Sequence, residues 1–271
     1  ATDYSLLIAG NSSGADFSNA TVITGGTFNG NTITFTGVDL DDGQYFTLGT
    51  QFFRCSPGGV ENNLVLWLKA NAGTNTTTNG ANVTSWDDQY GSNDAVGTDP
   101  PTYNSSGLNF NPTIDFTAAN TNYMIIAHQA AQTTDQQALF VVGSFTSASV
   151  GYAPFIIKTE TWNWDNGWGL GSDNESDVML YLKDAWPGVG SMSQQTMGYN
   201  TPAINISRTD ASNYYNNLNL GTDDVNSKNT RSASTDDITI GASPDGVNAA
   251  LPARRDFLDG TIGEIIMYNA P

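Results

Sequence analysis

The stretch LVLWLKA, residues 64–70, decides the fold class, because apolar side chains occupy both faces of an extended chain over its first five positions. A short continuous apolar run bounded by turn residues is typical of a strand buried on both sides. Loop residues flank it, with Pro57-Gly58-Gly59 before and a Thr-, Asn- and Gly-rich segment at residues 71–80 after. The stretch predicts a strand between a sandwich core and a covering segment.

A second long apolar stretch, GTIGEIIMY at residues 260–268, lies near the end of the sequence. Side chains alternate between the two faces of a regular strand. Strict alternation places Ile262, Glu264, Ile266 and Tyr268 on one face and Gly263, Ile265 and Met267 on the other.

Between these stretches, short segments rich in β-branched and aromatic residues alternate with turn signals. Strands are expected at residues 83–86, 113–116, 123–127, 138–145, 155–158, 167–170, 178–182, 203–208, 213–218 and 237–240. The one helix-like stretch, residues 127–137, is at most a short turn. Many short strands without intervening helices favour an antiparallel sandwich over βαβ units.

Residues 1–56 form a separate N-terminal segment in this interpretation. Strands are expected at residues 4–9, 21–23, 31–38 and 44–48, and the run Ser-Pro-Gly-Gly at 56–59 marks a boundary. A few strands in so short a segment do not easily bury a core alone. The segment either pairs with the main domain, residues 57–271, or completes a preceding domain.

Composition narrows the class of protein. The chain of 271 residues has a net charge of −18 and only 13% charged residues. The absence of a basic stripe to neutralise phosphates disfavours nucleic acid and anionic membranes as partners. No apolar run reaches the roughly 18 residues of a membrane-spanning helix. A single cysteine, Cys55, forbids an intrachain disulfide. Export without disulfides favours a bacterial surface protein, with a signal peptide removed or the chain an internal segment.

Four blocks occur in a fixed order along the main domain. They read PGGVENNLVLWLKANAG at 57–73, SWDDQYGSNDA at 85–95, PPTYNSSGLNFNPTIDF at 100–116 and DGTIGEIIMYN at 259–269. This set resembles the laminin-G-like, concanavalin A-like jelly rolls of large surface proteins from Bacteroidota and related marine bacteria. The resemblance covers residues 57–269 and implies a two-sheet antiparallel jelly-roll sandwich. It constrains function weakly, because this fold hosts lectins, adhesins, spacers and some hydrolases and lyases.

The polar turn at residues 87–94 is a candidate calcium site. Asp87, Asp88, Asn93 and Asp94 offer oxygen ligands around Gly91, and hard cations prefer such oxygens. The alternative is a polar turn whose Asp and Asn side chains cap their own backbone. Secondary calcium candidates at residues 39–43, 223–224 and 236–237 read as solvated turns.

A tryptophan-rich segment is the candidate ligand site. Trp162 and Trp164 would share one face of a strand, with Asn163 and Asp165 beside them. Indole faces and nearby amides and carboxylates suit a glycan, whereas the alternative places both indoles in the core. Trp168, in the run GWGLG, is expected in the core.

Catalytic constellations are sparse. Glycoside hydrolysis needs two carboxyl groups at a set separation, and the only glutamates are Glu61, Glu160, Glu175 and Glu264. The only histidine, His128, has no nucleophile elbow around it, and Cys55 has no histidine nearby.

The sequence therefore predicts a non-catalytic, extracellular binding or adhesion module of a larger secreted or cell-surface protein. The expected partners are a glycan or another cell-surface ligand and the neighbouring domains of the same protein, with Ca²⁺ as the expected cofactor. The alternatives are a structural spacer or filament unit without a soluble ligand and, last, a carbohydrate-active enzyme.

Overall fold

The computed structural model describes residues 4–9, 20–50, 56–146, 152–160, 166–172, 177–182, 192–228, 233–245 and 254–271. The chain divides into two compact units, Ala1–Cys55 and Ser56–Pro271. The division lies beside the Ser-Pro-Gly-Gly run at residues 56–59. No helix in the described ranges is long and apolar enough to cross a membrane.

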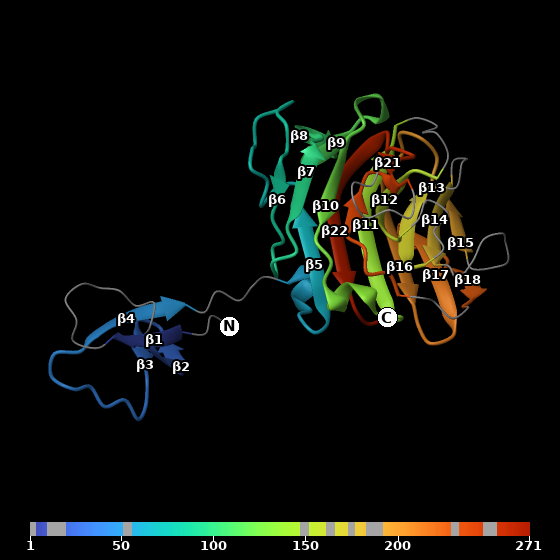
Figure 1. The fold of residues 1–271 in the computed structure, drawn as a ribbon. Helices are drawn as coiled ribbons and strands as arrows, with labels where there is room; N and C mark the ends of the chain where they lie inside the picture. The colour runs from blue at the N-terminus through green and yellow to red at the C-terminus, as the bar shows by residue number, and fades with distance from the viewer. Residues whose placement is uncertain are drawn as a thin grey trace. The chain divides into compact units, whose positions relative to one another are not determined.

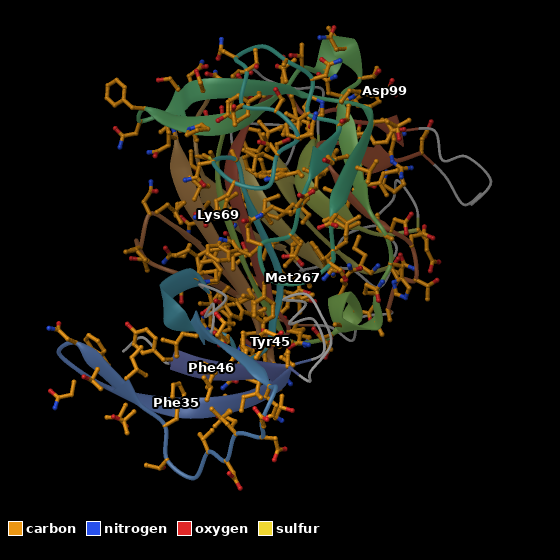
Figure 2. The ribbon with its side chains drawn as sticks, turned by 90° about the vertical axis from the view of Figure 1, so that its left-hand side faces the viewer. Phe35, Tyr45, Phe46, Lys69, Asp99 and Met267 are labelled. Carbon is orange, nitrogen blue, oxygen red and sulfur yellow. The ribbon has the colours of Figure 1, made fainter. Side chains whose placement is uncertain are left out.

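The N-terminal unit contains a four-stranded antiparallel sheet in the order β3-β2-β1-β4 (Figure 1). Its strands are β1 (Tyr4–Ala9), β2 (Thr21–Asn29), β3 (Thr32–Thr34) and β4 (Tyr45–Thr50). Leu6 and Ile8 of the central strand β1 are buried. Their partners on β4, Leu48 and Phe46, are 53% and 60% exposed, and Figure 2 labels Phe46 and its neighbour Tyr45.

The main unit is a sandwich of two sheets in which every described strand pairing is antiparallel, which confirms the predicted fold class. We name each sheet after one of its inner strands. The β12 sheet has the order β15-β14-β13-β12-β19-β10-β7-β6. Its strands are β6 (Ser85–Trp86), β7 (Ala95–Asp99), β10 (Tyr123–Ile126), β12 (Pro154–Lys158), β13 (Trp168–Ser172), β14 (Asp177–Leu182), β15 (Met192–Thr196) and β19 (Ile238–Ile240).

The β22 sheet has the order β18-β17-β16-β11-β22-β9-β8, and β5 also pairs with β22. Its strands are β5 (Leu64–Lys69), β8 (Thr102–Leu108), β9 (Asn111–Phe116), β11 (Gln137–Phe145), β16 (Ala203–Thr209), β17 (Asn213–Leu218), β18 (Asp224–Ser227) and β22 (Gly260–Tyr268). The smaller elements are β20 (Ser243–Pro244), β21 (Arg254–Arg255) and the 3-10 turns η1 (Pro57–Gly59), η2 (Ala118–Asn120) and η3 (Ala130–Thr133).

The core lies between the two sheets. The β22 sheet contributes Leu66, Ile114, Leu139, Ile265 and Met267, and the β12 sheet contributes Trp86, Met124, Ile156, Trp168 and Ile240. Phe145 and Phe155 stack across the two sheets with ring centroids 4.4 Å apart. Trp168 is 2% exposed, as expected from its GWGLG context.

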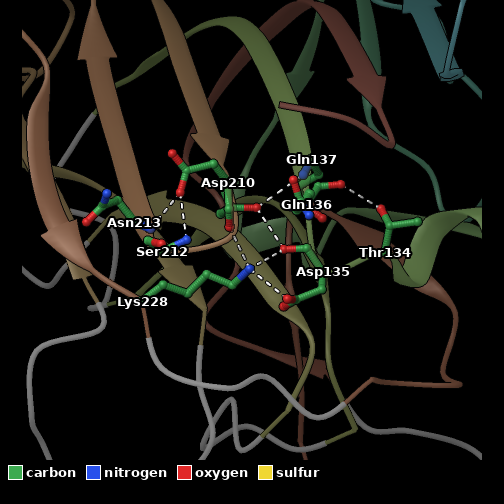
Figure 3. Close-up of polar contacts among 9 residues, drawn as sticks. Thr134, Asp135, Gln136, Gln137, Asp210, Ser212, Asn213 and Lys228 are labelled. Carbon is green, nitrogen blue, oxygen red and sulfur yellow. Dashed lines mark hydrogen bonds and ion pairs between the residues drawn. The ribbon is translucent and has the colours of Figure 1, made fainter.

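Lys228 fixes one corner of the β22 sheet (Figure 3). Its ammonium group donates to the Asp135 carbonyl, the Asp135 carboxylate and the Asp210 carbonyl, each at 2.7 Å. The Asp210 carboxylate accepts the Ser212 N–H at 2.7 Å and the Tyr215 hydroxyl at 2.7 Å. These hydrogen bonds hold the pKa of Asp210 below its ordinary value, Ser212 having the largest effect. The contacts join the start of β11 to the β16–β17 turn and the end of β18.

Strand β22 departs from the strict alternation expected from sequence. Its pairing with β11 shifts by one residue, so that Val142 lies opposite Glu264 while Gly143 lies opposite Ile262. Gly263 is the extra residue of this β-bulge. Ile262, Ile265 and Met267 consequently all face the core. The predicted grouping of Ile262 with Glu264, Ile266 and Tyr268 on one face is therefore wrong.

The bulge predicts opposite consequences for two neighbouring isoleucines. Ile265→Ala should lower the free energy of unfolding by about 2–5 kcal/mol, as is typical for truncation of a core aliphatic side chain. Ile266→Ala is the matched control and should give a clearly smaller loss, because Ile266 lies on the partly exposed outer side. Urea unfolding of both variants measures the difference. Equal losses would contradict the register described above.

Candidate ligand-binding face

The outer face of the β22 sheet, turned away from the core, is apolar and hollowed. Two neighbouring pockets lie along its inner strands β22, β11 and β16. The strands β22, β11 and β16 present their outward side chains in register across this face. The outward residues are Glu264, Ile266 and Tyr268 on β22, Val142, Phe140 and Ala138 on β11, and Ile204, Ile206 and Arg208 on β16. A contiguous, partly exposed apolar surface is a common feature of interaction sites, which makes this face the candidate site.

The first pocket, which we call the amide pocket, has a volume of about 410 Å³. Polar side chains surround an aliphatic floor that includes Val142, Ile204 and Gly263. The polar residues are Lys69, Asn71, Asn109, Asn111, Asn219 and Glu264. An apolar pocket with a few convergent polar groups is the usual form of a small-molecule site.

Contacts within the sheet set the charged side of the amide pocket. The indole N–H of Trp67 donates to the Glu264 carboxylate at 2.6 Å. The ammonium group of Lys69 lies 4.9 Å from the centre of the Trp67 ring. Lys69 and Glu264 are cross-strand partners on β5 and β22. Trp67 therefore holds a cation and a carboxylate side by side at the edge of the pocket.

Turn geometry sets the opposite side. The Asn219 amide oxygen accepts the Ile204 N–H at 2.9 Å, and the Asn219 N–H donates to the Ile204 carbonyl at 2.9 Å. Across the sheet, the Asn111 amide donates to the Asn109 carbonyl at 3.1 Å. The two Asn219 bonds tie the turn after β17 to Ile204 in the floor of the amide pocket, and the Asn111 bond is internal to the β8–β9 turn.

The second pocket, which we call the aromatic pocket, has a volume of about 590 Å³. Phe140 and Tyr268 meet edge to face in its wall with ring centroids 6.3 Å apart. The Tyr268 hydroxyl donates to the Val60 carbonyl at 3.1 Å, and burial raises the pKa of Tyr268. Arg208 borders the pocket, stacked 3.6 Å from the centre of the Tyr215 ring. The pocket offers aromatic and aliphatic surface with one cation at its rim.

The predicted calcium turn, residues 87–94, is closed by hydrogen bonds within itself and to β5, and we call it the clip. The two oxygens of the buried Asp88 carboxylate accept the N–H groups of Trp67 at 3.0 Å, Tyr90 at 3.1 Å and Asn93 at 3.2 Å. The Asp94 carboxylate accepts the Asp88 N–H at 2.8 Å. Asp87 is exposed. The carboxylates thus bind backbone donors, the alternative that the sequence left open.

The fit of this turn to a metal ion is poor, because Asp88 already uses both oxygens. No cluster of three or more Asp, Glu, His or Cys side chains suited to a metal occurs within the described parts of the chain. Calcium binding by Asp87, Asp88, Asn93 and Asp94 stays a prediction. The predicted glycan site, Trp162, Asn163, Trp164 and Asp165, lies outside the described residues.

A chain of buried and half-buried polar groups continues from the clip to the other sheet. Asn93 donates to the Val65 carbonyl at 2.7 Å, and its amide oxygen accepts from Gln132 at 3.1 Å. Gln132, 1% exposed on η3, accepts from Lys158 at 3.4 Å, and its carbonyl accepts the Trp168 indole N–H at 3.0 Å. The chain ties β5 to β12 and β13 at one end of the sandwich.

Lys158 ends this chain as a fully buried cation. Its ammonium nitrogen lies 2.9 Å from the ring nitrogen Nδ1 of His128 and donates to the Asp236 carbonyl. Burial lowers the pKa of Lys158 from 10.5 to about 8, and Asp237 and Asp236 oppose that shift. Because it is buried and hydrogen-bonded on several sides, we assign Lys158 a structural role.

Sequence reasoning missed most of the outer face. Phe140, Ile206 and Arg208 belong to stretches that were expected only as strands, and the Asn109 and Asn219 turns were not singled out. Alternation was the available signal. Residues 138–145 are apolar on both faces, and only one face can point to the core. In residues 203–208 alternation places Ile204 and Ile206 together on one face.

Comparison with known proteins supports the sandwich fold. No protein-family model matches the sequence, and no curated protein matches it. The binding domain of botulinum neurotoxin serotype C1 superposes with a TM-score of 0.51 at 12% identity, over 77% of this chain and 49% of that chain. Domain 4 of an extracellular arabinanase from Geobacillus stearothermophilus, in complex with arabinotriose, superposes with a TM-score of 0.48 at 13% identity. The match covers 77% of this chain and 93% of the arabinanase domain. Trypanosoma rangeli sialidase, in complex with sialic acid, superposes with a TM-score of 0.48 at 14% identity. The match covers 79% of this chain and 33% of the sialidase chain. At 12% identity the similarity to the toxin binding domain is one of fold.

Asp88→Ala should destabilise the main unit by about 3 kcal/mol, because buried N–H groups left without an acceptor cost about 1–3 kcal/mol each. The loss should be equal with and without a chelator. Asp87→Ala is the matched control and should stay within about 0.5 kcal/mol, as exposed substitutions usually do. Thermal melting measures both. A wild-type melting temperature that falls on chelation, with Asp87→Ala also destabilised, would favour calcium instead.

The lowered pKa of Lys158 predicts a pH dependence of stability. Between pH 8 and 10.5 the unfolded chain holds the Lys158 proton and the folded chain has lost it. The free energy of unfolding therefore rises with pH between pH 8 and 10.5, by at most about 1.4 kcal/mol per pH unit. Below pH 8, Lys158 makes no pH-dependent contribution to it. Lys158→Met removes this contribution. The difference in unfolding free energy between wild type and variant, measured by urea unfolding, should grow from pH 8 to pH 10. A constant difference would contradict the assignment.

Proposed function

We propose that this chain is a non-catalytic glycan-binding module of a larger secreted or cell-surface protein. The observation that carries the proposal is the outer face of the β22 sheet, where the amide pocket and the aromatic pocket lie on one continuous surface. A sugar presents apolar C–H faces and many hydroxyl groups. The outer face offers the matching groups, with rings and aliphatic side chains for the former and amides for the latter.

The proposal is non-catalytic because of the carboxylates. Glycosidases use a pair of carboxyl groups about the scissile bond. Among the described residues that line the amide pocket, Glu264 is the one carboxylate, and it accepts the Trp67 indole N–H. This arrangement suits a positioning contact with a hydroxyl group better than acid–base work.

The extracellular setting rests on composition. A chain with 13% charged residues, many amides and one cysteine resembles exported bacterial surface modules, and its net charge of −18 disfavours nucleic acid. The neighbouring domains of a larger surface protein are the proposed protein partners.

Gly263→Leu tests the proposed function by filling the amide pocket from its floor. A Cβ at Gly263 would meet nothing closer than 3.7 Å, so the side chain extends into the pocket without backbone strain. The variant should keep the wild-type melting temperature within a few degrees and lose at least tenfold in affinity for the glycan that a broad array identifies.

Val96→Leu is the matched control, since Val96 is exposed on the β12 sheet. It should bind as wild type does. Isothermal titration calorimetry measures the affinities. A wild-type domain that binds no glycan, or a Gly263→Leu domain that binds normally, would contradict glycan binding at this pocket.

A further inference from the structure

Two turns beside the amide pocket carry bulky apolar residues in an unfavourable backbone conformation. Asn109-Phe110 joins β8 to β9, and Asn219-Leu220 follows β17. All four residues have positive φ, of 46°, 64°, 53° and 60° in sequence order. Phe110 is 89% exposed and Leu220 is 81% exposed. Within the described ranges no other large apolar side chain is as exposed.

Both turns have a large apolar residue where a glycine is favoured, and both expose that residue to water. Two-residue turns with positive φ favour Asn followed by Gly, because a side chain at the second position is strained. Phe110 and Leu220 occupy that second position, and at this exposure they gain little from burial. Strain kept at two separate turns is a sign of function rather than of folding.

The two turns flank one site. Asn109 and Asn219, the first residues of the turns, both line the amide pocket. The sheet order β17-β16-β11-β22-β9-β8 places the β8–β9 turn on one side of the pocket and the turn after β17 on the other. Phe110 and Leu220 are therefore next to the pocket on opposite sides.

The lining of the pocket limits the charge of its ligand. Lys69 and Glu264 are the charged groups among its described lining residues, and their charges cancel. The remaining polar groups are amides, which bind hydroxyl groups as donors and acceptors. The net charge of −18 also repels an acidic ligand at long range.

We propose that Phe110 and Leu220 form an apolar clamp that holds a neutral oligosaccharide across the amide pocket. The inference rests on the proposed function and adds the ligand class and the gripping residues. A chain of several uncharged sugar units extends beyond the pocket on both sides, and its C–H faces contact the two tips.

Glycine substitution separates binding from stability at these positions. Phe110→Gly and Leu220→Gly relieve the positive-φ strain, so each should raise the melting temperature. Each should also weaken binding of the best neutral oligosaccharide from a panel of cellohexaose, xylohexaose and mannohexaose at least tenfold, with a larger loss in the double variant. Thr121→Gly is the matched control, since exposed Thr121 has a φ of 54° at the end of η2. It should raise the melting temperature and leave the affinity unchanged.

Four outcomes would overturn the clamp. If wild type binds an oligosaccharide and the glycine variants bind it equally well, the clamp is wrong while glycan binding stands. If wild type binds no sugar of the panel or of a broad array, the proposed function and the clamp both fall. Tighter binding of hexagalacturonate than of the neutral hexasaccharides would overturn the ligand class. Co-sedimentation with phosphatidylcholine vesicles that is lost in the glycine variants, with oligosaccharide affinity unchanged, would assign the tips to a membrane surface.

Discussion

The bulge at Gly263 is the constraint on which both the core and the outer face of the β22 sheet depend. A strand in strict alternation that buried Ile262 would also bury Glu264, and an isolated buried carboxylate is costly. The extra residue turns Glu264 outward while Ile265 and Met267 return to the core. The bulge is also where the neighbour of β22 changes. Gly260–Ile262 pair with β9 and Glu264–Tyr268 pair with β5, and the Gly263 carbonyl accepts the Ala70 N–H at 2.9 Å. The amide pocket lies at this change of partner, and residues of both neighbours, Lys69 and Asn111 among them, line it.

Local apolar pattern was sufficient to predict the fold class and most strands, because burial of apolar side chains selects them directly. The run at residues 64–70 became β5, with Leu66 and Leu68 in the core. The apolar pattern failed to predict strands that exist because a neighbouring strand offers hydrogen-bond partners. Strand β8 reads TYNSSGL, a polar sequence held largely by backbone bonds to β9, and β7, β15 and β18 were missed as well. The bulge at Gly263 is of the same kind, since only the register against β11 reveals it.

The polar residues show a second limit of sequence reasoning. An Asp–Asn turn looks the same whether its oxygens face a cation or backbone N–H groups, and Asp88 faces the latter. Its acceptors begin a chain through Asn93 and Gln132 to Lys158 that joins the two sheets. Buried polar groups of this kind are tolerated when each is satisfied, and they specify one arrangement of the elements around them. No spacing in the sequence connects residues 88, 132 and 158, so such a network follows only from the fold.

Backbone strain at Phe110 and Leu220 is greater than the geometry of their turns requires. Where the described chain turns through positive φ without glycine, asparagine often occupies the position, as at Asn63 and Asn200, and asparagine tolerates that conformation. Such positions follow from chain geometry alone. Phe110 and Leu220 do not, because a glycine would serve the same turns with less strain. Apolar side chains at those tips are also a liability in water, which an acidic surface offsets by keeping copies of the protein apart. The same negative field disfavours acidic ligands.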